Sequence, residues 1–209
     1  MTLLHRMRWS LGLLLLAPGL PLRLAAQDTL LAPRARGSLT APVTIYEMGD
    51  FQCPACKVFF DGTYKDLGKE YIATGKVRWI FINFPLSSIH PNAEAAAEFA
   101  MCASKQGKFW EAHDRLYTTQ QTWAPLVNPG QYFLAQTEAL GLRRDLMVSC
   151  LQSGAARALV QSDAAGAIKA GARSTPSFYI EGGMMAGAYP IGAFREVLDS
   201  ILKLKAARR

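Results

Sequence analysis

Apolar positions along the chain first follow a strand, helix, strand order. Residues 42–48, PVTIYEM, form an apolar and β-branched run that predicts a strand. From Pro54 to Gly75 the apolar side chains recur at the spacing of an amphipathic helix. Residues 77–84, VRWIFINF, are nearly all apolar, which is typical of a strand buried on both faces. These elements predict a β-α-β unit with a right-handed crossover.

The next pattern is purely helical. Residues 91–171 contain an alanine-rich stretch with a break near Gly107, followed by three further segments of helical character. Strand character returns in SFYIEGGMMAGAY, where two short apolar runs flank Gly182-Gly183 and predict a β-hairpin. An amphipathic helix over 190–205 follows. The predicted order is therefore β-α-β, a helical block, then β-β-α.

The first 26 residues differ from the rest of the chain. They combine basic residues, the run WSLGLLLLAPGLPL and two small residues at the end, without any acid. This composition predicts a secretory signal peptide over 1–26, with an uncleaved amino-terminal anchor as the alternative. Prolines and a glycine interrupt the run, which argues against a span of about 20 residues. Residues 27–40 predict a linker. We therefore expect a periplasmic or otherwise extracytoplasmic protein.

Charge adds little to this picture. The whole chain carries +7; without the three arginines of residues 1–26, 20 Lys and Arg face 16 Asp and Glu, which leaves +4. This mild excess does not favour a nucleic-acid partner. No segment typical of a dimerisation element stands out, so we expect a monomer.

Two cysteines lie close together in Cys53-Pro54-Ala55-Cys56. A zinc site normally takes four ligands from two close pairs, and only one close pair is present, so we expect no metal. A purely structural bridge between Cys53 and Cys56 would close too short a loop to stabilise the fold much. The pattern therefore favours a reactive dithiol.

The position of the dithiol explains its chemistry. Cys53 begins the predicted helix, where unpaired N–H groups and the helix dipole stabilise a thiolate and so favour the reduced form. Cys56, one turn further on, is expected to be buried and to act as the resolving thiol. A Cys-x-x-Cys motif at the first strand-to-helix turn indicates a thioredoxin-like α/β fold with an inserted all-helical domain. Its parts would be residues 41–90 and 172–209, with the insertion at 91–171.

Four sequence stretches together resemble the DsbA-like thiol–disulfide oxidoreductases, which are exported thioredoxin-fold proteins with a helical insertion. They are, in chain order, APVTIYEMGDFQCPAC, FPLSSIHPNAEAAAEFAMCASKQGKFWEAHDRLY, SCLQSG and STPSFYIEGG. The resemblance implies that Cys53 is the nucleophile, that Cys56 resolves the mixed disulfide and that Pro176 is a cis proline facing the dithiol. It also implies that Thr175 offers its backbone to substrate and that Glu47 is the buried acid that exchanges a proton with Cys56.

The same resemblance implies a function and partners. The function is disulfide formation in reduced, unfolded exported proteins without any cofactor, and the partner is a quinone-linked membrane reoxidase of the DsbB or vitamin-K-epoxide-reductase type. Ala55 departs from the best-known member, which has a histidine between its cysteines. Disulfide isomerase or reductase activity therefore stays an alternative, as does a non-catalytic chaperone or adaptor. Asp50 is interpreted as a turn or cap residue, and the alternative interpretation of Glu47 is an ordinary acid at a strand end.

Cys102 and Cys150 are the other two cysteines, each within a helical pattern. Four cysteines allow three full pairings. Export favours a structural Cys102–Cys150 disulfide, and similar exported relatives carry such a bridge in their helical region. Two inert buried thiols and a second redox pair are the alternatives.

Overall fold

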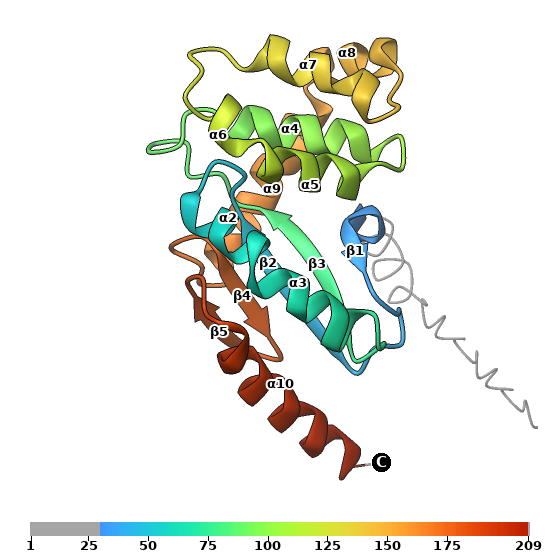
Figure 1. Cartoon of the computed structure of the whole chain (residues 1–209), viewed down its shortest axis with the longest axis vertical. Coiled ribbons are helices and arrows are strands. Elements are labelled where there is room, and N and C mark those ends of the chain that lie inside the picture. The colour runs from blue at the N-terminus through green and yellow to red at the C-terminus, as the bar shows by residue number, and fades with distance from the viewer. Residues whose placement is uncertain (1–29, 209) are drawn as a thin grey trace, which may run out of the picture.

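A five-stranded sheet forms the centre of the protein in the computed structural model, which describes residues 30–208. The strand order is β1-β3-β2-β4-β5, with β2 and β3 parallel and the other neighbours antiparallel (Figure 1). The strands are β1 (Ala35–Arg36), β2 (Val43–Gly49), β3 (Val77–Asn83), β4 (Ser177–Ile180) and β5 (Gly183–Ala186).

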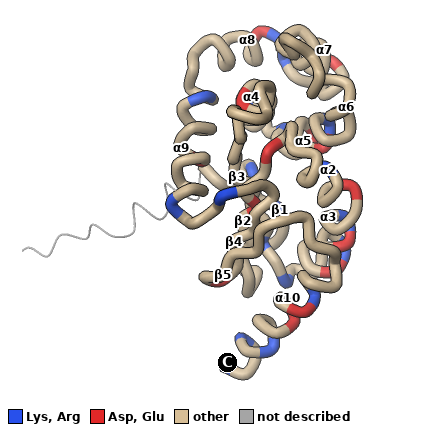
Figure 2. The backbone as a smooth tube through the Cα atoms, turned by 90° about the vertical axis from the view of Figure 1, so that its left-hand side faces the viewer, with Lys and Arg blue, Asp and Glu red and all other residues tan. Residues whose placement is uncertain are grey.

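Helices cover both faces of the sheet. The helices α2 (Pro54–Asp61), α3 (Thr63–Leu67) and α10 (Ile191–Ala206) pack on one face, together with a π-helical turn at Gly68–Ile72. The helix α9 (Ala155–Lys169) lies on the other face, and the two layers are separated by the sheet in the side view (Figure 2). Alternation along the strands directs one set of apolar side chains to each layer.

The predicted insertion, residues 91–171, includes α9, but this helix packs on the sheet. The remaining helices form the insertion, which lies at the end of the sheet where β2 and β3 finish (Figure 1). Its members are α4 (Ala93–Ser104), α5 (Phe109–Thr118), α6 (Gln120–Trp123), α7 (Gly130–Ala139) and α8 (Arg144–Gln152). Many side chains of α4 are small alanines, so its neighbours pack closely against it and almost the whole helix is buried. The apolar core of the insertion is continuous with Phe51, Cys53 and Cys56, so the dithiol lies where insertion and sheet domain meet.

The predicted fold class is confirmed, because the β-α-β unit, helical block and β-β-α unit occur in that order. Two local features differ from the prediction. The helix expected from Pro54 to Gly75 breaks at Gly62, whose ψ of −93° is not helical. Part of the stretch expected to be a linker joins the domain: Ala35–Arg36 pairs with β3, and the buried Arg34 bonds to Asp163 of α9.

The expected signal peptide, residues 1–26, lies outside the described residues. Within residues 30–208, none of the helices combines the length and the apolar character that crossing a bilayer requires.

We predict that Gly49→Ala destabilises the protein by about 1–3 kcal/mol, the usual cost of overpacking a core. A Cβ at this position would lie 2.4 Å from the Phe81 ring, which is fully buried and stacked on Phe51. Gly166→Ala is the matched control, because nothing lies within 4 Å of its Cβ and it sits inside α9. There alanine should stabilise by about 0.5–1 kcal/mol. Urea unfolding measures both; equal effects of the two substitutions would contradict the packing described.

Candidate active site

The dithiol lies at the junction between β2 and α2. Cys53 is the N-cap residue of α2, with an extended backbone, and Pro54 occupies the first helical position, where no N–H is needed. The N–H of Cys53 donates to the carbonyl oxygen of Asp50, and the carbonyl oxygen of Cys53 accepts the N–H of Lys57. Both cysteines are free thiols; Cys53 is 6% exposed and Cys56 is 1% exposed. Cys53 is thus the sulfur that an incoming thiol can reach first.

The loop before β4 faces the dithiol from the other side. The Thr175–Pro176 peptide bond is cis, and the carbonyl oxygen of Thr175 lies 3.4 Å from Cys53 Sγ, close enough to accept a hydrogen bond from the protonated thiol. The structure thereby brings Cys53, Thr175 and Pro176 together, although more than 100 residues separate them in the chain. The Thr175–Pro176 loop therefore borders the approach to Cys53.

The pKa values of the two cysteine thiols are shifted in opposite directions. The pKa of Cys53 is lowered to about 6, chiefly because the Cys56 thiol donates a hydrogen bond to its sulfur. Burial opposes this shift, while the N–H groups of Cys56 and Ala55 at the start of α2 add to it. The pKa of Cys56 is raised well above its usual value, first by burial and then by its hydrogen bond to Cys53. At neutral pH the pair therefore holds one proton, on Cys56.

Glu47 lies on β2, below the dithiol. It is 2% exposed, and its Oε2 accepts a hydrogen bond of 3.0 Å from Trp79 Nε1. Burial raises the pKa of Glu47 to about 8, and the bond from Trp79 only partly offsets that rise. The Glu47 charge in turn raises the pKa of Cys56. The carboxyl group of Glu47 is therefore protonated at neutral pH, and it lies close enough to Cys56 to influence the pKa of that thiol.

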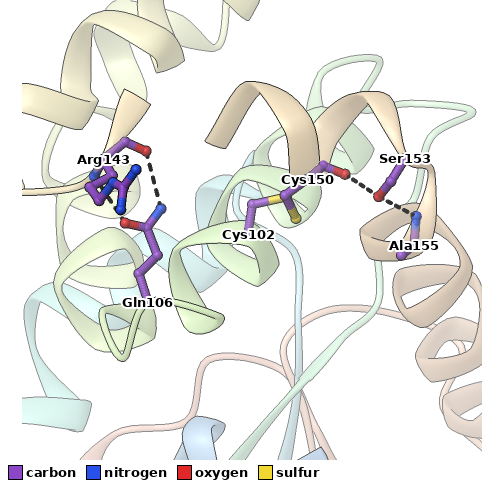
Figure 3. Close-up of a disulfide and its surroundings, with 6 residues drawn as sticks. All are labelled: Cys102, Gln106, Arg143, Cys150, Ser153 and Ala155. Atoms are coloured by element: carbon purple, nitrogen blue, oxygen red, sulfur yellow. Dashed lines mark hydrogen bonds between the residues drawn. A yellow bond between two sulfur atoms is a disulfide. The ribbon is translucent and has the colours of Figure 1, made fainter. Parts of the chain in front are cut away.

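Cys102 and Cys150 form a disulfide between α4 and α8, at a sequence separation of 48 (Figure 3). Close to it, Gln106 exchanges two hydrogen bonds with the backbone of Arg143, and Ser153 Oγ bonds to the Cys150 carbonyl. In the chain-entropy model, a disulfide that closes a loop of this length stabilises the folded protein by roughly 4 kcal/mol. The bridge thus ties the two ends of the insertion together and does not share residues with the dithiol.

Asp50 is a turn residue, as the sequence indicates, but it does more than cap one N–H. Its carboxylate accepts the N–H of Gln52 at 2.7 Å and the N–H of Leu86 at 2.9 Å, and it pairs with His90 Nδ1 at 2.7 Å. Sequence reasoning missed this link, and it also missed Gln120, which bonds to the same turn. Most of their partners lie in distant segments, at Leu86 and His90 for Asp50 and at Phe51 and Cys53 for Gln120, and such contacts leave no pattern in the sequence.

We predict that Cys56→Ala raises the pKa of Cys53 from about 6 toward the value near 8.5 of an ordinary thiol. The substitution removes the main hydrogen-bond donor to the Cys53 sulfur while keeping the helix N-terminus. Thiolate absorbance near 240 nm, followed from pH 4 to 10, gives the pKa in both proteins. A midpoint that stays near pH 6 in the variant would show that the helix alone sets the acidity.

We predict that Glu47→Gln stabilises the oxidised protein at neutral pH but not at pH 4. A raised pKa in the folded state means that protonated Glu47 contributes stability below about pH 4.5, and that this contribution is lost as pH rises toward 8. The glutamine does not ionise, so its advantage should grow across that interval to the order of 1–3 kcal/mol, and thermal melts should detect it. Glu138→Gln, at an exposed position on α7, is the control. An advantage that is constant with pH would contradict a neutral buried Glu47.

Comparison with known proteins places this site in a family. The chain matches the thioredoxin family model over residues 29–200. It is 32% identical to the probable disulfide bond formation protein D of Bacillus anthracis, over 80% of this chain and 77% of that protein. It is also 32% identical to the Na(+)/H(+) antiporter NhaA 1 of Salinispora arenicola, but the match spans 79% of this chain and only 24% of the antiporter.

Solved structures support the same fold. The α-DsbA1 protein of Wolbachia pipientis superposes with a TM-score of 0.74 at 21% identity, covering 84% of this chain and 93% of that one. Oxidised BdbD from Bacillus subtilis also gives a TM-score of 0.74, at 23% identity, covering 84% and 95%. The fold, the dithiol at the start of α2 and the relatives agree, and the chain belongs to the thioredoxin family, within its DsbA-like thiol–disulfide oxidoreductases.

Proposed function

We propose that this protein forms disulfides in exported proteins by dithiol–disulfide exchange through Cys53 and Cys56. The observation that carries the proposal is the opposite acidity of the two sulfurs, with the pKa of Cys53 lowered to about 6 by its bond from Cys56 and that of Cys56 raised by burial. A stabilised thiolate on Cys53 favours the reduced dithiol, and this makes the disulfide form oxidising. The relative from Bacillus anthracis is named for disulfide bond formation, which supports the same direction.

The reaction begins with the oxidised Cys53–Cys56 pair. A substrate thiolate attacks Cys53 Sγ, the Cys53–Cys56 bond breaks, and Cys56 leaves with the electron pair and takes up a proton. A second substrate thiolate then attacks the substrate sulfur of the mixed disulfide, and Cys53 leaves as a thiolate. The substrate loses two electrons and gains a disulfide, and the protein gains those two electrons. The protonated Cys56 then donates to the Cys53 thiolate and stabilises the product.

Three further residues have roles in this proposal. Glu47 holds a proton up to a pKa of about 8, set by its burial, and supplies it toward Cys56 when that sulfur leaves. The backbone beside Thr175 and Pro176 receives an extended substrate segment next to Cys53, a placement supported by the 3.4 Å separation of the Thr175 carbonyl oxygen and Cys53 Sγ. The Cys102–Cys150 bridge acts as a structural cross-link of the insertion.

The proposal includes an exported location and a membrane partner. Residues 1–26 have the composition of a signal peptide, cleaved or kept as an anchor, and the reduced protein needs an electron acceptor after each turnover. A quinone-linked reoxidase of the DsbB or vitamin-K-epoxide-reductase type is the class that fits. The antiporter relatives are about four times as long as the matched region, so the activity in their name is not carried over.

A disulfide isomerase or reductase is the second candidate. The specific observation in its favour is the moderate acidity of Cys53, because a pKa of about 6, lowered chiefly by Cys56, lies between the roughly 3.5 of DsbA and the roughly 7 of thioredoxin. Ala55 supplies no side-chain donor that would lower it further.

We predict that the oxidised protein transfers one disulfide per molecule to a reduced, unfolded cysteine-containing protein such as ribonuclease A. Mass spectrometry after quenching with a thiol-blocking reagent measures both reactants. Cys53→Ala should abolish transfer, and Cys56→Ala, which cannot form the Cys53–Cys56 disulfide, should abolish it as well. The double substitution of Cys102 and Cys150 by alanine is the control and should keep transfer. Repair of scrambled ribonuclease by the reduced protein, without oxidation of the reduced substrate, would instead establish the isomerase.

A further inference from the structure

The turn that carries Cys53 is held from outside by one buried side chain of the insertion. Gln120, on α6, is 6% exposed. Its Nε2 donates to the carbonyl oxygen of Phe51 at 2.7 Å and to the carbonyl oxygen of Cys53 at 3.0 Å. In Figure 1, α6 lies directly above the start of α2. A single amide group therefore fixes the residues on both sides of Gln52.

The orientation of this amide follows from its partners. Both partners are carbonyl oxygens, which only accept hydrogen bonds, so the NH₂ end must face them. The positive end of the amide dipole thus points at the first turn of α2. The Cys53 carbonyl also accepts the N–H of Lys57, the first hydrogen bond of that helix. Gln120 therefore adds a second donor to the carbonyl at the helix start, and that start is where the Cys53 thiolate is stabilised.

Neighbouring contacts reinforce the same connection. Gln52, inside the turn, donates to the carbonyl of Ala124 at 3.0 Å and accepts the N–H of Asn92 at 2.6 Å. The Asn92 side chain donates to the carbonyls of Ala124 and Leu126. Tyr117 Oη, on α5, lies 3.4 Å from the carbonyl oxygen of Asp50. The segment around the nucleophile is thus held by the insertion rather than by the sheet domain alone.

We propose that Gln120 is a positioning residue that holds the Phe51–Cys53 turn so that the N–H groups of α2 face the Cys53 sulfur, and that the insertion thereby sets the reactivity of the dithiol. The inference rests on the proposed function for its biological meaning, but its test does not. The pKa of Cys53 is lowered chiefly by the Cys56 thiol, and also by the N–H groups of Cys56 and Ala55. The Thr175 side chain, on the loop before β4, also lowers this pKa. All of these donors depend on the direction in which the turn presents the sulfur.

Two substitutions test the proposal. Gln120→Met keeps the length of the side chain and removes the donor. Gln120→Glu keeps the shape and places a carboxylate against two carbonyl oxygens, near the thiolate. We expect the Met variant to raise the midpoint of the thiolate absorbance titration by about 0.5–1 pH unit and to shift the glutathione equilibrium about three- to tenfold toward the oxidised protein. The Glu variant should raise the titration midpoint further and shift the glutathione equilibrium further toward the oxidised protein.

Two controls separate positioning from a general loss of stability. Gln121→Met changes an exposed neighbour on the same helix and should match the wild type. Phe133→Leu weakens the packing of Trp123 and Phe99 without touching the turn, so it should lower the melting temperatures of both redox forms alike. Gln120→Met should lower the melting temperature of the reduced form more than that of the oxidised form. Equal losses in both forms, with an unchanged titration midpoint and glutathione equilibrium, would overturn the proposal.

The wild-type protein provides a test that does not depend on a variant folding. In nuclear magnetic resonance spectra, the side-chain amide protons of Gln120 should exchange slowly with solvent and change chemical shift when the dithiol is oxidised. Exchange as fast as that of Gln121 would contradict the proposal. A wild-type protein that transfers no disulfide, but shows the predicted change in Gln120→Met, would sink the proposed function and leave this inference standing.

Discussion

The hydrogen bond from the Cys56 thiol to the Cys53 sulfur is the interaction on which the rest of the site depends. It is the largest cause of the lowered pKa of Cys53, and the same bond helps to raise the pKa of Cys56. Burial pushes both pKa values upward, so a lone thiol in the Cys53 position would be a weak nucleophile and a poor leaving group. The fold brings the two sulfurs into contact at the start of a helix. The pKa of Cys53 is therefore lowered despite burial, while burial still raises the pKa of Cys56.

The size of the pKa shift of Cys53 determines how much it changes the redox potential of the Cys53–Cys56 pair. With Cys53 at a pKa of about 6, owing first to the bond from Cys56, the thiolate stabilises the reduced form by about 1 kcal/mol at pH 7. For a two-electron couple this is roughly 20–30 mV, a fraction of the roughly 150 mV between thioredoxin and DsbA. A larger shift toward the potential of DsbA would have to come from other contacts with the dithiol segment. The bonds from Gln120 to the carbonyls of Phe51 and Cys53, and those from Gln52 to the insertion, are the contacts available there.

The sequence predicted the elements well because their patterns are local. The strand at Val77–Asn83 is a continuous apolar run, and the hairpin around Gly182 has a clear turn signal. The break at Gly62 and the pairing of Ala35–Arg36 with β3 were not predictable, because each depends on tertiary contacts. In the site, Cys53 and Cys56 follow from their spacing, whereas Pro176 and Glu47 could be named only through the family resemblance. Gln120 has neither kind of signal, since a glutamine in TTQQTW resembles any polar surface residue until its partners are seen.

The measurement that tests the central claim most directly is the glutathione redox potential of the Cys53–Cys56 pair as a function of pH. If the pKa of Cys53 is about 6 because Cys56 donates to its sulfur, reduction takes up two protons below that pH and one above it. The potential should then fall by about 59 mV per pH unit below pH 6 and by about 30 mV per unit above it, and at pH 7 it should be less negative than the roughly −270 mV of thioredoxin. A slope of about 59 mV that continues to pH 8, with a value at pH 7 of about −270 mV or lower, would contradict the account.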